Sequence, residues 1–168
     1  MWDKNARSKR VQTNRGPKVV ENTKTAIFVR GSKTSQVIID VLSDLYSLRK
    51  PDAINFTKKN EVHPFDDETS IEFFARKNDS SLFAVGMHSK KRPHNLILGR
   101  MFNYQILDMI ELGIERCAPM KDFKAATSAV GMRPLMVFNG EAFNHSEDMV
   151  RLKSTLLDFF RGEVAEMV

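Results

Sequence analysis

The 168-residue sequence has very little cysteine and no long apolar run. Its single cysteine, Cys117, permits neither an internal disulfide nor a cysteine metal cluster, and it fits a reducing compartment. No apolar stretch reaches the roughly 18 to 20 residues that a membrane span needs. The charged start, MWDKNARSKR, is not followed by an apolar stretch and is therefore no secretory signal. With 42% hydrophobic and 28% charged residues, the composition excludes wholesale disorder and suits one ordinary domain.

Recognisable catalytic and metal-binding patterns are also missing. No G-x-S-x-G sequence occurs, so a serine nucleophile on a strand–turn–helix elbow is not indicated. Asp66, Asp67 and Glu68 stand beside His63, but successive acids in a loop are more often solvated or capping residues than metal ligands. The four histidines lie in four different contexts: His63, His88, His94 and His145. We therefore expect no catalytic residue, no metal and no cofactor.

One stretch imitates a phosphate-binding loop. Residues 31–35, with the sequence GSKTS, stand between a predicted strand and a predicted helix. A P-loop needs two glycines with lysine directly after the second, whereas Ser32 separates Gly31 from Lys33 and no glycine stands five positions before Gly31. A phosphate-binding enzyme using the Gly31–Ser35 turn is thus a remote alternative. The start of a helix can still bind one phosphate, including an RNA backbone phosphate, or the turn can be a plain helix cap.

Positive charge is concentrated at the N-terminus. The net charge is +5, and residues 1–24 hold seven Lys or Arg and two acids, while residues 25–168 balance 19 bases against 19 acids. A basic arm on a near-neutral globule suits a polyanion, because phosphates attract lysine and arginine and binding releases counterions. The alternative is a solubilising leader. Residues 1–24 show almost no apolar periodicity, so we expect an arm that is partly disordered and orders, if at all, on a partner.

The first part of the chain predicts an α/β (α+β) domain from residue 25 onward. Residues 105–115 fit a helix or an alternating strand, and we favour the strand. The two strands expected at 82–85 and 96–101 should pair in antiparallel fashion as a hairpin, and the tip of this hairpin is basic. The expected elements are a strand at 26–29, a helix at 37–48, a long polar loop at 49–70, a helix capped by Thr69 or Ser70, hairpin strands at 82–85 and 96–101, and a short helix at 122–126.

The last third of the sequence repeats the first. A strand at 134–138 precedes Gly140, and a helix follows with apolar residues from Val150 to Phe160. Gly140 stands 109 residues after Gly31 and Leu152 stands 110 after Leu42, which suggests two related halves. We expect a first half at 25–126 and the start of a second at 127–168. Because the second half stops after its helix, we expect a fragment that is insoluble or aggregates until missing strands are supplied.

Basic pairs in the predicted loops are the best candidates for a functional surface. These clusters are Arg49 with Lys50, Lys58 with Lys59, and Lys90 with Lys91 and Arg92. All of them lie in the first half of the body, whereas residues 141–168 hold six acids and three bases. Most phenylalanines stand at core-like positions, which favours recognition of RNA backbone and shape over base stacking. The alternative is scattered surface charge on a module whose main task is to hold a protein partner.

Three long strings carry a family resemblance: residues 50–83, KPDAINFTKKNEVHPFDDETSIEFFARKNDSSLF; residues 88–114, HSKKRPHNLILGRMFNYQILDMIELGI; and the ending RLKSTLLDFFRGE. With them, nearly the whole chain resembles the ribosome production factor 2 proteins of the Brix family. The resemblance implies a Brix domain of two anticodon-binding-like halves, the second incomplete here. It also implies that the family's basic C-terminal tail is absent from this chain.

The resemblance implies an assembly role and no catalysis. It implies action in the nucleolus on precursors of the large ribosomal subunit, in a heterodimer with the regulator of ribosome synthesis protein. The pair would help to recruit 5S rRNA with its two ribosomal proteins. The open edge of the second half would hold that partner or the missing C-terminal segment. The residues that we expect to contact RNA are Arg7, Lys9, Arg10, Arg15, Lys18, Arg49, Lys50, Lys58, Lys59, Lys90, Lys91 and Arg92, with Lys33 as a weaker candidate.

Overall fold

The computed structural model describes residues 6–14, 16, 17, 19, 23–123, 129–132 and 134–160. The elements follow one another as α1 (Ala6–Asn14), β1 (Ala26–Gly31), α2 (Gln36–Arg49), β2 (Ala53–Asn60), α3 (Thr69–Asn78), β3 (Leu82–Met87), β4 (Asn95–Phe102), β5 (Gln105–Gly113), a 3-10 turn (Met120–Asp122), α4 (Ala142–His145) and α5 (Glu147–Phe160).

One mixed sheet of five strands organises the domain, in the order β2–β1–β3–β4–β5. Strand β1 pairs in parallel with β2 and with β3, because α2 and then α3 carry the chain back to the starting edge of the sheet. Strands β3, β4 and β5 follow as an antiparallel meander. The expected α+β class and the antiparallel hairpin are confirmed.

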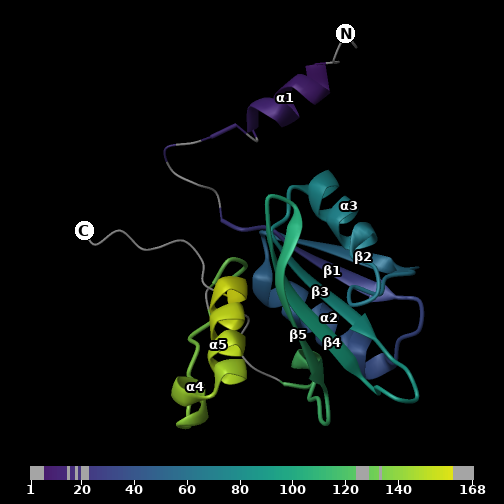
Figure 1. Ribbon diagram of the computed structural model, residues 1–168, viewed down its shortest axis with the longest axis vertical. Coiled ribbons are helices and arrows are strands. Elements are labelled where there is room, and N and C mark those ends of the chain that lie inside the picture. Colours follow the sequence, from purple (N-terminus) through teal and green to yellow (C-terminus); the bar gives the residue numbers. More distant parts are fainter. Residues whose placement is uncertain are drawn as a thin grey trace.

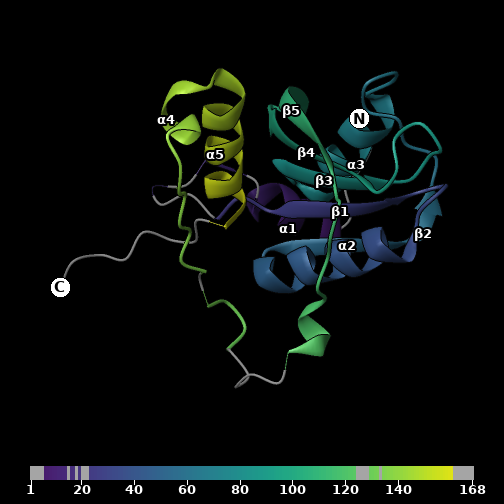
Figure 2. The ribbon, with the colours of Figure 1, turned by 90° about the horizontal axis from the view of Figure 1, so that it is seen from below.

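Helices cover both faces of the sheet (Figures 1 and 2). On one face, Phe28 of β1 packs with Ile38 and Leu42 of α2 and with Phe159 of α5. On the other face, Val29 belongs to a second apolar cluster with Ile71 of α3. Successive residues of a strand point to opposite faces, so a strand that is covered on both sides is an unbroken apolar run. This explains why β1 is apolar from Ala26 to Val29 without alternation.

The predicted loop at 49–70 is wrong over its first part, which forms β2. This strand lies at an edge of the sheet, and its second half is polar, with Thr57, Lys58 and Lys59 exposed. Only its first residues pack against apolar neighbours: Ala53 in one cluster, Ile54 and Phe56 in the other. An edge strand needs little apolar surface, so its polar half resembles a loop in the sequence.

The helix expected near residue 70 is confirmed as α3, but neither Thr69 nor Ser70 caps it. The Thr69 amide donates to Asp67 Oδ1 over 3.0 Å, so the side chain two residues earlier satisfies this amide. Hydrogen bonding from the Thr69 side chain, and secondly from the Thr69 amide, lowers the pKa of the Asp67 carboxyl. Asp67 also forms an isolated bridge with His63, which folds the segment before α3 into a compact loop.

The strand predicted at 134–138 is wrong, because this segment forms no strand. Leu135 and Val137 are 89% and 77% exposed, and only Met136 among the apolar residues here packs against the first cluster. A strand requires a neighbour to complete its hydrogen bonds, and the described residues offer it none. The division at residue 127 into two halves stays a prediction.

The helix predicted from Val150 is confirmed as α5, and it packs on the same sheet as α2. The short helix predicted at 122–126 falls mostly outside the described residues, and the 3-10 turn at Met120–Asp122 comes just before it. Helix α1 was not expected from the sequence, and Figure 1 draws it away from the sheet. Within the described residues, no helix has the length and apolar character for crossing a membrane.

Candidate nucleic-acid interface

Basic residues gather at the edge of the sheet where β1, β2 and β3 end. Parallel strands that start together also end together, and the register pairs Gly31 with Asn60 and Arg30 with Gly86. Five exposed lysines lie at or just beyond these ends: Lys58 and Lys59 within the last residues of β2, Lys33 in the loop after β1, and Lys90 and Lys91 in the loop after β3. We call these five residues the basic edge. Across the described part of the chain, none of the five has an ion pair.

The turn between β1 and α2 is built as a helix cap. The Ser35 side chain accepts from the amide of Ile38 over 3.4 Å, and Arg30 Nε donates to Thr34 Oγ1 over 3.0 Å. The carbonyl of Lys33 accepts from the amide of His88 over 2.8 Å, which ties this turn to the end of β3. The hydroxyls of Thr34 and Ser35 are thus engaged within the protein, while Ser32 and Lys33 are exposed.

The turn between β3 and β4 presents its lysines outward. Its two sides are joined by Ser89, whose amide donates to the Arg92 carbonyl and whose hydroxyl accepts from the Arg92 amide, both over 3.0 Å. Arg92 Nη1 lies 2.8 Å from Glu111 Oε1 on β5 and 2.9 Å from Oε2. The charge of Arg92 is therefore largely offset, whereas Lys90 and Lys91 at the tip stay available to a polyanion.

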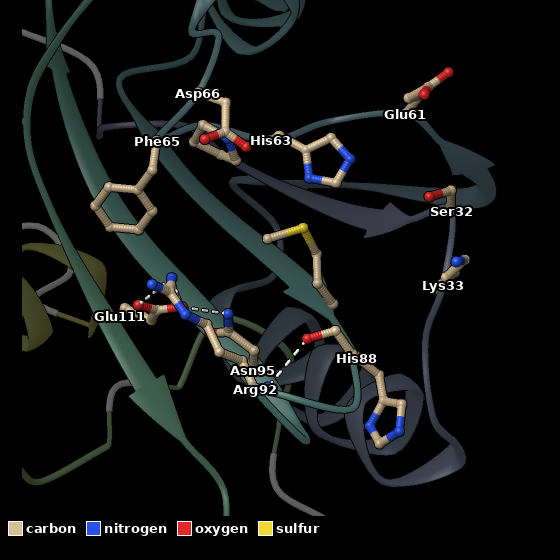
Figure 3. A pocket seen from close by; sticks show the side chains of 13 residues that line it. Ser32, Lys33, Glu61, His63, Phe65, Asp66, His88, Arg92, Asn95 and Glu111 are labelled. Atoms are coloured by element: carbon tan, nitrogen blue, oxygen red, sulfur yellow. Dashed lines mark hydrogen bonds and ion pairs between the residues drawn. The ribbon is translucent and has the colours of Figure 1, made fainter.

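A cavity of about 690 Å³ opens beside the basic edge. Figure 3 shows His63, Phe65 and Asp66 on one side of it and Arg92, Asn95 and Glu111 on the other. Ser32 and Lys33 complete one wall. This volume falls in the range of small-ligand sites.

A metal centre is not among the features of this cavity. His63, Asp66 and Glu61 line it, yet in the described segments no three His, Cys, Asp or Glu side chains come together as ligands. His88 and His94 contact each other instead: the His94 amide donates to His88 Nδ1 over 3.1 Å, and Ser35 Oγ lies 2.7 Å from His94 Nδ1.

Arg49 and Lys50 lie between α2 and the start of β2, at the opposite end of the strands from the basic edge. Arg49 is only 6% exposed, and its Nη2 donates to the Lys24 carbonyl. Burial lowers the pKa of its guanidinium, against an opposing effect of the Asp52 charge. Lys50 Nζ stands 4.7 Å from the centre of the Tyr46 ring. The structure does not bring this pair to the basic edge, and Arg49 has a structural role.

The arm residues are placed separately from the basic edge. Arg7, Lys9 and Arg10 belong to α1, where the side chains of Lys9 and Arg10 are exposed. Arg15 and Lys18 lie outside the described residues. The arm therefore offers a second basic surface on a separate helix.

Sequence reasoning missed the cavity and three of its residues. Phe65 is 50% exposed, although phenylalanines were expected in core-like positions, and Asn95 and Glu111 come together across paired strands. The available signal was Phe65 itself, an aromatic residue within a polar stretch between Pro64 and three acids.

Comparison with known proteins agrees with this architecture. Residues 31–167 match the model of the Brix domain. The ribosome production factor 2 homologue of Schizosaccharomyces pombe is 50% identical over 160 residues, covering 95% of this chain and 50% of the relative. The human homologue is 48% identical over 159 residues, covering 95% and 52%. The ribosome biogenesis protein RPF2 of Saccharomyces cerevisiae is 43% identical over 165 residues, covering 98% and 48%.

By their names, these relatives are ribosome production and ribosome biogenesis proteins. The chain spans about half the length of the curated relatives that it matches. The resemblance to ribosome production factor 2 proteins is confirmed across nearly the whole chain, and the match to the domain model covers most of it. The chain belongs to the Brix domain family.

Proposed function

We propose that this chain acts in ribosome production as a non-catalytic factor that binds ribosomal RNA. The names of its relatives support a role in making ribosomes. Such a role supports a location in the nucleus and, as the finer part of the proposal, in the nucleolus. The five lysines of the basic edge carry the proposal, because they lie at the ends of three adjacent strands and are not neutralised by described partners. Phosphates bind such clusters and release counterions.

The finer part of the proposal concerns partners. The protein recruits 5S rRNA with its two ribosomal proteins to the large-subunit precursor, and it does so as a heterodimer with the regulator of ribosome synthesis protein. The resemblance to ribosome production factor 2 proteins supports this part. Because α1 lies apart from the basic edge, a single RNA can contact two basic surfaces of the same chain.

The test replaces Lys58, Lys59, Lys90 and Lys91 together by Gln and measures affinity for 5S rRNA and for a large-subunit rRNA fragment over a series of salt concentrations. Each lost phosphate contact should reduce the magnitude of the negative slope of log K against log salt by about 0.7 to 0.9. We expect the variant to lose two to four such contacts, and its slope should be shallower by the corresponding amount.

A matched control replaces four basic residues elsewhere by Gln: Arg76, Lys77, Lys121 and Arg151. These residues lie on α3, the 3-10 turn and α5, away from the basic edge. The control should keep the wild-type slope, although its change in net charge is the same. Equal slopes for the two quadruple variants would contradict the proposal.

A second candidate function is a protein-interaction scaffold with secondary RNA contact. The outer edge of β5 supports it, since among the described strands β5 pairs only with β4, and Leu107 on β5 is 64% exposed. Replacing Lys90, Lys91 and Arg92 together should weaken RNA binding and leave the heterodimer intact by size-exclusion chromatography. Equal loss of both activities in a folded variant would show that one surface serves both.

A further inference from the structure

The cavity beside the basic edge has one aromatic wall. Phe65 projects from the loop before α3 and is 50% exposed, while Pro64 beside it is buried and anchors that loop. Figure 3 shows the Phe65 ring facing the side of the cavity that holds Arg92 and Glu111. An exposed ring on an anchored loop is a platform for stacking a flat ligand, and nucleic-acid bases are such ligands.

The opposite wall is rich in hydrogen-bond acceptors. Glu111 Oε1 accepts from Arg92 Nη1 and from Asn95 Nδ2, which hold the carboxylate in place. Glu111 Oε2 accepts one hydrogen bond, from Arg92 over 2.9 Å, so it retains a lone pair for a ligand. Asn95 is 5% exposed, and its Oδ1 has no hydrogen-bond partner among the described residues. A buried acceptor without a partner costs free energy that a nearby donor can recover.

The charge at this wall favours a neutral ligand group over a cation. Arg92 already offsets the Glu111 carboxylate, so a second ammonium or guanidinium would gain little there. A neutral N–H group can still donate to Oε2. Phosphates attached to the ligand would lie at the mouth of the cavity, where Lys33 stands and where Lys90 and Lys91 follow Ser89 on the adjoining turn.

We propose that the cavity takes a single unpaired RNA base, stacked on Phe65, with an amino-bearing edge directed at Glu111. The inference rests on the proposed RNA binding by the basic edge and adds a base pocket to it. The volume of about 690 Å³ accommodates one nucleotide but no helix, so paired bases are excluded. Cytosine carries an amine where uracil carries a carbonyl, and a carbonyl would meet the carboxylate with repulsion.

The test compares short RNA hairpins that are identical except at one bulged position, which holds cytidine, uridine or an abasic linker. Fluorescence anisotropy with the full chain measures each affinity at one fixed salt concentration. The wild type should bind the cytidine bulge roughly 5- to 150-fold more tightly than the abasic hairpin, as expected for one stacked base. It should bind the uridine bulge more weakly than the cytidine bulge.

The variant Phe65→Ala should lose the preference for the base-bearing hairpin, and Phe65→Tyr should keep it. The control Phe73→Ala removes a similarly exposed ring, 58% exposed, from α3 outside the cavity and should bind as the wild type does. In Phe65→Ala the slope of log K against log salt should stay unchanged, because no phosphate contact is lost.

Three results would overturn the base pocket. The first is equal affinity of the wild type for the cytidine and abasic hairpins, which is also what a pocket for a cationic peptide side chain would give. The second is a preference that survives in Phe65→Ala. The third is uridine binding as tightly as cytidine. Failure of the basic-edge proposal looks different, since the quadruple lysine variant would then keep the wild-type salt slope.

Discussion

Arg100 Nη1 on β4 lies 2.9 Å from Asp158 Oδ2 on α5, and this ion pair joins the last described helix to the sheet. Arg100 also pairs with Asp108 of β5, and hydrogen bonding to Asp108 is the main reason why the pKa of Arg100 is raised. Lys24, just before β1, reaches the other oxygen of Asp158 over 3.0 Å. Asp158 thus ties the chain before β1 and the middle of the sheet to α5, so its loss should loosen α5 from the sheet.

The variant Asp158→Asn should lower the free energy of unfolding by about 1 to 2 kcal/mol at pH 7, because it leaves Arg100 and Lys24 without one shared partner. Burial acts to raise the pKa of Asp158, but the hydrogen bonds and charges of Arg100 and Lys24 outweigh it, and the pKa is lowered. A lowered pKa stabilises the fold above the unfolded value of about 3.9, and this stabilisation is lost as the pH falls through the folded value.

Urea unfolding of the wild type and of Asp158→Asn at pH 7 and at pH 3 checks this expectation. The difference between the two proteins should be full at pH 7 and smaller at pH 3. Asp148→Asn, at an exposed carboxylate of the same helix, should change stability by only a few tenths of a kcal/mol. A difference for Asp158→Asn that does not change with pH would exclude the ion pairs as its cause.

Gly86 on β3 is required by the close approach of α2 to the sheet. A Cβ atom at this position would lie 2.4 Å from Ile38 Cγ2 and 2.7 Å from Leu42 Cδ1. Gly86→Ala should therefore destabilise the fold by about 1 to 3 kcal/mol, since both side chains belong to the packed core. Thermal unfolding measures the effect, and Gly113→Ala is its control, because a Cβ atom on Gly113 would meet no atom within 4 Å. Equal melting temperatures for the two variants would show that α2 moves away freely.

Periodicity predicted the elements that bury a continuous apolar surface. Strand β1 and helices α2 and α5 carry Phe28, Ile38 and Phe159 into one core, and each was expected from the sequence. Strand β2 was missed because an edge strand can be half polar. Residues 134–138 were predicted as a strand because Leu135 and Val137 have the right composition, yet composition does not supply a pairing partner. The local pattern therefore predicted burial better than it predicted pairing.

The candidate site could be predicted only in part for a related reason. Lys58, Lys59, Lys90 and Lys91 were visible as basic pairs in the sequence, but their placement at one end of the sheet depends on the parallel pairing of β1 with both β2 and β3. Glu111 and Asn95 meet through the register of β4 and β5, which the alternation along β5 does not specify. Arg49 was indistinguishable from Lys50 in the sequence, because burial depends on the whole fold.

The difference between the buried Arg49 and its neighbour Lys50 can be tested by replacing each of them. Arg49→Met retains the length of the side chain but removes the hydrogen bond from Nη2 to the Lys24 carbonyl. We expect the free energy of unfolding to fall by about 1 to 3 kcal/mol, while the affinity of the folded protein for RNA stays the same. Lys50→Met should change the stability by less than about 1 kcal/mol. Weaker RNA binding by an Arg49→Met variant of undiminished stability would return Arg49 to the RNA-binding residues.

The basic arm should be tested by a deletion that spares Lys24. Lys24 belongs to the folded domain, since its carbonyl accepts from Arg49 and its ammonium pairs with Asp158. Deleting residues 1–22 removes the other six basic residues of the arm and keeps these two contacts. If five of the removed charges meet phosphate, the slope of log K against log salt should fall by several units, at about 0.7 to 0.9 per contact. The free energy of unfolding should change little in this deletion. A deletion of residues 1–24 would also remove the two contacts of Lys24 and so would mix a loss of stability with the loss of charge. An unchanged slope would show that the arm does not contact RNA, and the basic edge would then account for the whole electrostatic contribution.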